Sequence, residues 1–97
     1  MAAWQLTWIY KLTDPREGQH YCYVGMSTDP KRRLRHHKAY AKGNRRLSRW
    51  LKLLKRKGLE PEMTIMEQCY YRKDAREAEE DCISAIKAIR GRYCLNA

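Results

Sequence analysis

The sequence of 97 residues lacks several features that define other classes of protein. It has no apolar run near the ~20 residues that a membrane-spanning helix needs, and no basic-then-apolar leader opens it. Its four cysteines form no CxxC pair and its three histidines have no metal-site spacing, which argues against a zinc or redox motif. We therefore expect a soluble protein of the cytoplasm or nucleoid, with free thiols and no small-molecule cofactor.

Acidic residues are absent from one long part of the chain. Residues 30–57 contain 13 of the 21 lysines and arginines and no aspartate or glutamate, and the net charge of the chain is +10. A solvated helix face normally mixes both signs, so this segment indicates a surface for a polyanion, with nucleic acid first. An anionic membrane surface is the weaker alternative, because Leu47, Trp50, Leu51 and Leu54 form a stripe that is typical of a buried helix face.

Hydrophobic periodicity and breaker residues divide the chain into six elements. Strands are predicted over residues 4–12, 20–26 and 61–69, and helices over residues 30–41, 45–57 and 75–89. We expect residues 27–29 to cap the first helix, Asp74 to cap the third, and Gly58 to follow the second. The order β-β-α-α-β-α predicts one α+β domain over residues 1–97, with a small antiparallel sheet flanked by helices.

The third predicted helix carries one carboxylate on its apolar side. Its apolar stripe consists of Ala75, Ala78, Cys82, Ile83, Ile86 and Ile89. At about 100° per residue, Glu79 projects between Ile83 and Ile86. A carboxylate on a core-facing arc is costly unless it is paired or binds a cation. Glu79 is therefore either a salt-bridge partner at the edge of the stripe or a metal ligand.

Five polar residues stand where the predicted elements could bring them to one edge of the sheet. Tyr10 and Tyr23 lie on neighbouring strands. Arg33 and His37 share one helix face at positions i and i+4, and Glu79 comes from the third helix. Phosphodiester hydrolysis uses such a set: a carboxylate that holds a divalent cation, an arginine that neutralises charge on phosphorus, and a tyrosine or histidine that orients or deprotonates water.

The order of these residues resembles that of the GIY-YIG nucleases. The first family motif is similar to "WIY" at residues 8–10, the second to "YVG" at residues 23–25, and the arginine helix to "RLRHH" at residues 33–37. The family's glutamate pattern matches Ala75, Glu79 and Ile83, and its closing asparagine matches Asn96. The sequence departs from the family at Trp8, where the first motif has a glycine.

The resemblance implies a three-stranded sheet with flanking helices and the activity of a metal-dependent DNA endonuclease. The implied catalytic residues are Tyr10, Tyr23, Arg33, His37 and Glu79. One Mg²⁺ or Mn²⁺ ion would be held mainly by Glu79, and Tyr10 or a metal-linked group would activate water. Arg33 would stabilise the phosphorane, and Gly25 and Asn96 would support the site structurally.

Contacts with nucleic acid are predicted at eight basic residues: Lys31, Arg32, Arg35, Lys38, Lys42, Arg45, Arg46 and Arg49. The predicted partner is duplex or branched DNA, and the resemblance allows an additional DNA-binding domain outside this chain. Two alternatives stay open. A non-catalytic nucleic-acid-binding module that retains the fold explains the basic segment, and so does an adaptor for an acidic partner, but neither explains the polar set. Homing, restriction and repair roles are not distinguished.

Overall fold

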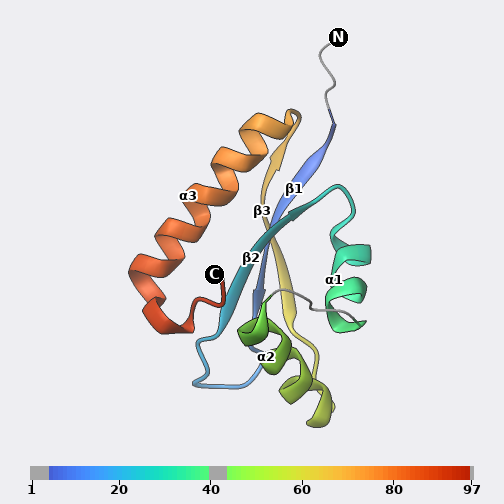
Figure 1. Ribbon diagram of the computed structural model, residues 1–97, viewed down its shortest axis with the longest axis vertical. Helices are drawn as coiled ribbons and strands as arrows, with labels where there is room; N and C mark the ends of the chain where they lie inside the picture. The colour runs from blue at the N-terminus through green and yellow to red at the C-terminus, as the bar shows by residue number, and fades with distance from the viewer. Residues whose placement is uncertain (1–4, 40–43, 97) are drawn as a thin grey trace.

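The computed structural model describes residues 5–39 and 44–96, apart from the side chains of residues 36–39. Its elements are β1 (Thr7–Thr13), β2 (Cys22–Ser27), α1 (Pro30–Ala39), α2 (Arg45–Arg56), β3 (Glu62–Cys69), α3 (Arg72–Arg90) and a short 3₁₀ helix, η1 (Gly91–Tyr93). The predicted order of strands and helices and the predicted α+β class are confirmed. Figure 1 shows α3 along one side of the sheet and α1 and α2 on the other.

The three strands form one antiparallel sheet in the order β2-β1-β3, so β1 is central and β2 is an edge strand. In the β1–β2 hairpin, Tyr10 pairs with Gly25 and Leu12 pairs with Tyr23. Residues that face each other across an antiparallel pair share one face of the sheet. The two tyrosines of the sequence motifs therefore lie on the same face.

The pairing of β1 with β3 shifts by one residue between Ile9 and Tyr10, which leaves Met66 of β3 without a partner on β1. Trp8, which stands where the resemblance has a glycine, keeps its regular pairing with both neighbouring strands. A bulge of this kind bends the strand and increases its twist. The irregularity therefore lies next to Tyr10 rather than at the substituted position.

Alternation along the strands divides the hydrophobic core into two layers. The layer between the sheet and α3 contains Ile9, Cys22, Val24, Cys69, Ala75, Ala78, Ile86 and Cys94. The layer between the sheet and α2 contains Tyr10, Leu12, Leu47, Trp50, Leu51, Leu54 and Leu95. Because successive side chains of a strand point to opposite faces, Ile9 faces α3 and Tyr10 faces α2. The predicted apolar stripe of α2 is confirmed.

Local side chains set the ends of α1 and α2. The Asp29 carboxylate accepts a hydrogen bond from the backbone N–H of Arg32 at 3.2 Å and caps α1. The Asn44 side chain caps α2 by accepting from the backbone N–H of Leu47 at 3.0 Å. Gly58 follows α2 with a φ of 70°, a conformation that favours glycine. The predicted last residues of the first helix, 40 and 41, lie outside the described residues.

α3 differs from its prediction at both ends. It begins at Arg72 and its N-cap residue is Tyr71, so the predicted cap at Asp74 is wrong. Asp74 lies inside the first turn, where a carboxylate interacts favourably with the positive end of the helix dipole. Ile89 was expected in the apolar stripe but is 79% exposed, whereas Cys94 in the segment after η1 is buried in the core layer under α3.

That C-terminal segment returns to the sheet beside β2. Cys94 forms a parallel bridge with Cys22, and the backbone N–H of Leu95 donates to the carbonyl oxygen of Cys22 at 2.8 Å. The Asn96 side chain donates to the carbonyl oxygen of Val24 at 2.7 Å and accepts from the Val24 N–H at 2.9 Å. These bonds fix the backbone of the second sequence motif.

All four cysteines are free thiols, as predicted. In the part of the chain that the structure describes, no helix has the length and apolar character that a membrane span requires.

Candidate active site

The ring of Tyr10 lies against the backbone of Gly25 on the neighbouring strand. Tyr10 is fully buried. A Cβ atom at residue 25 would lie 2.5 Å from the Tyr10 hydroxyl oxygen and 2.6 Å from its Cζ atom, closer than real Cβ contacts come. Glycine is required here because the tyrosine ring occupies the space of a side chain. The hydroxyl of Tyr10 consequently lies beside β2, the edge strand.

Arg33 of α1 joins Tyr10 at this edge, where a hydrogen bond links the two side chains. The guanidinium is the donor and the phenolic oxygen the acceptor, since arginine has no acceptor. Burial is the main cause of a raised pKa of Tyr10, and Tyr23 and Glu79 raise it further, whereas the charge and the hydrogen bond of Arg33 lower it. Tyr10 is therefore a neutral phenol at pH 7.

Tyr23 and Glu79 belong to the same electrostatic neighbourhood. Burial raises the pKa of Tyr23, the charge of Glu79 raises it further, and Arg33 lowers it. The pKa of the partly buried Glu79 is raised by burial and by Glu80, and it is lowered by Arg33 and Arg76. Two phenols, one guanidinium and one carboxylate thus lie within electrostatic reach of one another.

The topology explains how helices on opposite faces of the sheet contribute to one cluster. β2 is an edge strand, and both α1 and α3 contact it (Figure 1). Side chains that pass this edge from the two faces can meet beside residues 23–25. Tyr10 reaches the same place from β1, because its ring crosses Gly25.

The chain matches the family model of the GIY-YIG catalytic domain over residues 6–93. It belongs to the GIY-YIG family. The resemblance noted in the sequence is confirmed, and the family is one of nucleases. No curated protein and no solved structure gives a significant match to this chain.

In this GIY-YIG domain, four of the five predicted catalytic side chains come together: Tyr10, Tyr23, Arg33 and Glu79. His37 follows Arg33 by four residues on α1, and its side chain lies outside the described residues. The two residues predicted to have structural roles both contact the motifs: Gly25 contacts Tyr10, and Asn96 holds the backbone of Val24.

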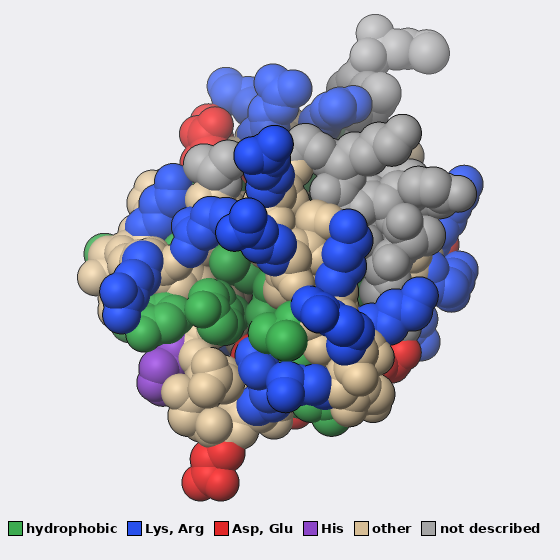
Figure 2. Space-filling model, turned by 60° about the horizontal axis from the view of Figure 1, so that its bottom comes forward, with side chains coloured by type: hydrophobic (Ala, Val, Ile, Leu, Met, Phe, Trp, Pro, Cys, Tyr) green, Lys and Arg blue, Asp and Glu red, His purple; other side chains and the backbone are tan. Residues whose placement is uncertain are grey.

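The basic segment forms an exposed surface over α1 and α2. Among the predicted nucleic-acid contacts, the described side chains are Lys31, Arg32, Arg35, Arg45, Arg46 and Arg49, and all are exposed. The side chain of Lys38 and all of Lys42 lie outside the described residues. Figure 2 shows Lys and Arg side chains gathered around the end of the molecule that carries α2, with few acidic side chains between them.

Arg46 also has a structural contact that the sequence did not predict. Its guanidinium donates to the carbonyl oxygen of Cys94 at 3.0 Å and to that of Arg92. Asn44 supports the same segment, because its side-chain amide donates to the carbonyl oxygen of Leu95 at 2.8 Å. No local pattern signals these bonds, since Arg46 and Cys94 are 48 residues apart in the chain.

Glu79 is the carboxylate of this cluster that suits a metal ion. Among the residues that the structure describes, no group of three or more histidine, cysteine, aspartate or glutamate side chains could hold an ion. Mg²⁺ needs no such group, because proteins usually bind it through one or two carboxylates together with water and substrate phosphates. The single partly buried carboxylate of Glu79 fits this mode, and divalent-metal dependence is general among GIY-YIG nucleases.

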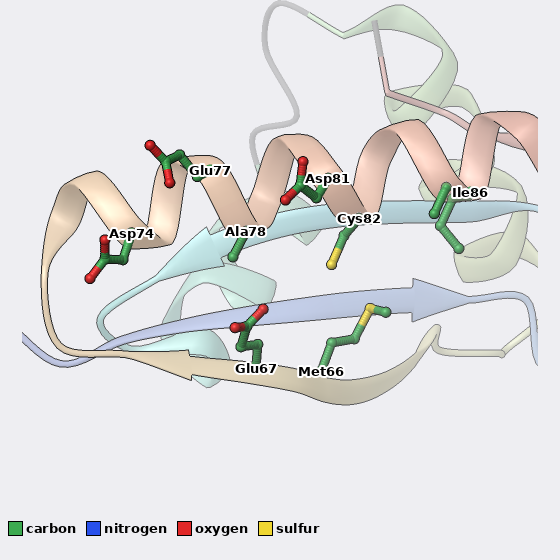
Figure 3. Close-up of a pocket in the computed structure, with 9 residues that line it drawn as sticks. Met66, Glu67, Asp74, Glu77, Ala78, Asp81, Cys82 and Ile86 are labelled. Carbon is green, nitrogen blue, oxygen red and sulfur yellow. The ribbon is translucent and has the colours of Figure 1, made fainter.

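A groove of about 450 Å³ lies apart from the cluster, between α3 and β3 (Figure 3). It is lined by Met66, Glu67, Asp74, Glu77, Ala78, Asp81, Cys82, Ala85 and Ile86. In Figure 3, Met66 and Glu67 point from β3 toward α3. Four carboxylates repel phosphate groups, and none of the four clustered residues that were predicted to be catalytic lines this groove. The acidic lining therefore makes this groove an unsuitable place for the DNA backbone to be cleaved.

Proposed function

We propose that this GIY-YIG domain is a divalent-metal-dependent DNA endonuclease that hydrolyses phosphodiester bonds. The observation that carries the proposal is the placement of the Tyr10 ring against Gly25 of β2, with Tyr23, Arg33 and Glu79 near enough for their charges to affect the pKa of Tyr10. A domain that only binds DNA has no need for a carboxylate at the margin of its core, where desolvation is costly. The alternative, a binding module that retains the fold, explains the basic surface but not this cluster.

Arg33 is proposed to stabilise the charge that develops on the phosphorane. Arg33 is an exposed residue, and its guanidinium has five N–H donors in a planar fork, of which the bond to Tyr10 uses only part. The other donors suit the oxygens of a phosphate group. The bond to a fully buried tyrosine limits the orientations of the fork, so the donors need little reorganisation during the reaction.

Tyr10 is proposed to orient the attacking water and to accept its proton, with assistance from Tyr23 and His37. Because burial raises the pKa of Tyr10, only a small fraction of the phenol is ionised at pH 7, and that fraction grows as the pH rises. The cleavage rate should therefore increase with pH through the neutral range. A pH–rate profile of the wild type beside that of Tyr10→Phe tests this, and equal activity of the two proteins would exclude Tyr10 as the acceptor.

Glu79 is proposed to hold one Mg²⁺ or Mn²⁺ ion. When bound, the ion supplies Lewis-acid stabilisation of the departing oxygen. The pKa of Glu79 is raised by burial and by Glu80, so the ionised carboxylate is destabilised until a positive charge compensates it. Arg33 and Arg76 supply part of that compensation, because their charges lower the pKa of Glu79.

The eight predicted basic contacts on and between α1 and α2 are proposed to bind phosphates on either side of the scissile bond. Such contacts fix the position of DNA without carrying sequence information. The substrate would be duplex or branched DNA, in a homing, restriction or repair setting within the cytoplasm or nucleoid. An additional DNA-binding domain would supply any sequence preference.

The direct test is incubation with plasmid, linear and branched DNA, with and without Mg²⁺ or Mn²⁺. Glu79→Gln keeps the shape of the side chain and removes its charge, so cleavage should fall to background while DNA binding persists. Glu77→Gln is the matched control, because it removes the same charge from an exposed position on the same helix. Cleavage by Glu79→Gln at the wild-type rate would overturn the assignment.

A further inference from the structure

A second hollow, of about 240 Å³, lies on the basic side of the molecule. We call it the α2 hollow, and it is lined by Tyr21, Arg46, Arg49, Trp50, Leu53 and Leu95. Figure 2 looks toward this end of the molecule and shows apolar side chains framed by Lys and Arg. The volume lies below the roughly 300–1,000 Å³ of sites for drug-sized ligands, so it suits a single ring system.

The aromatic walls of the α2 hollow are held in fixed orientations. The ring of Tyr21 packs edge-on against Tyr93, with centroids 5.3 Å apart and an interplanar angle of 73°. The indole N–H of Trp50 donates to the Asp14 carboxylate at 2.7 Å, and Trp50 is only 3% exposed. Tyr21 is partly exposed and offers the stacking surface, and a ring that is already fixed loses little conformational entropy when a ligand stacks on it.

The charges around the α2 hollow favour an anionic ligand. Arg46 lines the hollow and also holds the C-terminal segment, through its bonds to the carbonyl oxygens of Cys94 and Arg92. Arg49 is exposed at the rim, and no aspartate or glutamate lines the hollow. A planar apolar ring attached to a phosphate matches these walls, and that is the chemistry of a nucleotide.

The α2 hollow also lies at a defined distance from the catalytic cluster. Tyr21 directly precedes β2, and Gly25 lies four residues further along the strand, about 13 Å away at ~3.3 Å per residue. A stacked DNA strand advances ~3.4 Å per nucleotide, so this distance spans about four nucleotides. A DNA strand that passes along this side of the molecule, outside the C-terminal segment that bonds to Cys22 and Val24, would therefore reach both places.

We propose that the α2 hollow receives an unpaired base of the DNA substrate, within about four nucleotides of the scissile phosphate. This inference rests on the proposed function, because it takes DNA as the ligand. A base inside a duplex is stacked and paired, and its removal from the stack has a cost that is smallest where the base is already unpaired. The hollow therefore favours DNA with a bulge, a branch or a single-stranded segment.

The test compares DNA ligands of equal length and charge in buffer without divalent metal. One duplex carries a single bulged base, and the second carries an abasic residue at the bulge. Because the phosphates are the same, the ratio of the two affinities isolates the base. Stacking of one base typically changes affinity by about 5- to 150-fold, so the duplex with the bulged base should bind more tightly by a factor in this range.

Two variants examine the walls of the hollow and one serves as control. Leu53→Trp fills the hollow without changing charge, and Tyr21→Leu removes the stacking ring while keeping an apolar side chain. Both should bring the affinity ratio close to one. Lys52→Ala removes a charge from an exposed position of α2 that does not line the hollow, so it should weaken both ligands and keep the ratio.

Equal binding of the two bulged duplexes by the wild type would overturn the inference. An unchanged ratio in both folded variants of the hollow would do the same. With Mg²⁺ added, cuts should fall within about four nucleotides of the bulge, and cuts at unrelated positions would contradict the placement. If no DNA is cut under any condition but the affinity ratio holds, the nuclease proposal fails and the base-binding inference stands.

Discussion

Replacement of Gly25 by alanine should reduce both the stability and the activity of this domain. The added Cβ would lie 2.5 Å from the Tyr10 hydroxyl oxygen, whereas non-bonded heavy atoms prefer about 3.5–4.0 Å. The Tyr10 ring would therefore have to move by roughly 1 Å. Since Tyr10 is fully buried between the sheet and α2, this movement disturbs the packing around it and its bond to Arg33.

The size of the effect follows from this displacement. Overpacking in a core typically costs about 1–3 kcal/mol, which corresponds to a fall in Tm of roughly 4–24 °C for a domain of this size. A misplacement of about 1 Å in a catalytic group can lower the rate by about 100-fold. Thermal unfolding followed by circular dichroism measures the first effect, and single-turnover DNA cleavage well below Tm measures the second.

A second glycine provides the matched control. Gly18 has a φ of 77°, and a Cβ there would meet no atom within 4 Å. Gly18→Ala should lower stability by about 1–2 kcal/mol through backbone strain alone and leave the cleavage rate of the folded protein unchanged. In a Tyr10→Leu background, Gly25→Ala should cost little, because the ring is gone. Wild-type Tm and wild-type cleavage in Gly25→Ala would refute the reasoning.

Three further predictions concern single side chains. Arg33→Lys keeps the charge but loses the planar fork of donors, so DNA cleavage should slow by about 100-fold with little change in the Kd for DNA. An unchanged cleavage rate would mean that Arg33 only contacts a phosphate and does not stabilise the transition state. Burial raises the pKa of Asp14, but the hydrogen bonds from Arg16 and Trp50 have the larger combined effect and lower this pKa below its ordinary value. The Asp14 carboxylate therefore stabilises the fold above about pH 4, and this stabilisation is lost as the pH falls through the folded-state pKa. Asp14→Asn should therefore lower the free energy of unfolding by about 1.5–3 kcal/mol at pH 7, and urea titrations should show the difference shrinking in acid. Arg45→Ala should reduce the slope of log affinity against log salt by about 1 for every DNA sequence, and an unchanged slope would exclude Arg45 from the interface.

The sequence by itself determined the features that depend on neighbouring residues. Asp29, Asn44 and Gly58 set helix ends through bonds and backbone angles within a few positions, so the element order could be predicted. The apolar stripe of α2 was evident from its period for the same reason. The spacing of Tyr10, Tyr23, Arg33 and Glu79 sufficed to indicate the family, because a motif is a pattern along the chain.

The features that only tertiary structure decided all depend on contacts between distant segments. Asn96 bonds to Val24 across 72 residues, and no local pattern could specify that partner. Ile89 fits the apolar period of α3 but is exposed, whereas Cys94 of the C-terminal segment is buried in the core layer under that helix.

The need for glycine at position 25 has the same origin. It arises because the antiparallel register sets the Tyr10 ring over that position. The α2 hollow combines side chains from the residue before β2, from α2 and from the C-terminal segment, which become neighbours only when α2 and that segment pack against the same face of the sheet. Residue types and spacing fix what each side chain can do chemically, and the packing of helices across the edge strand decides which of them act together.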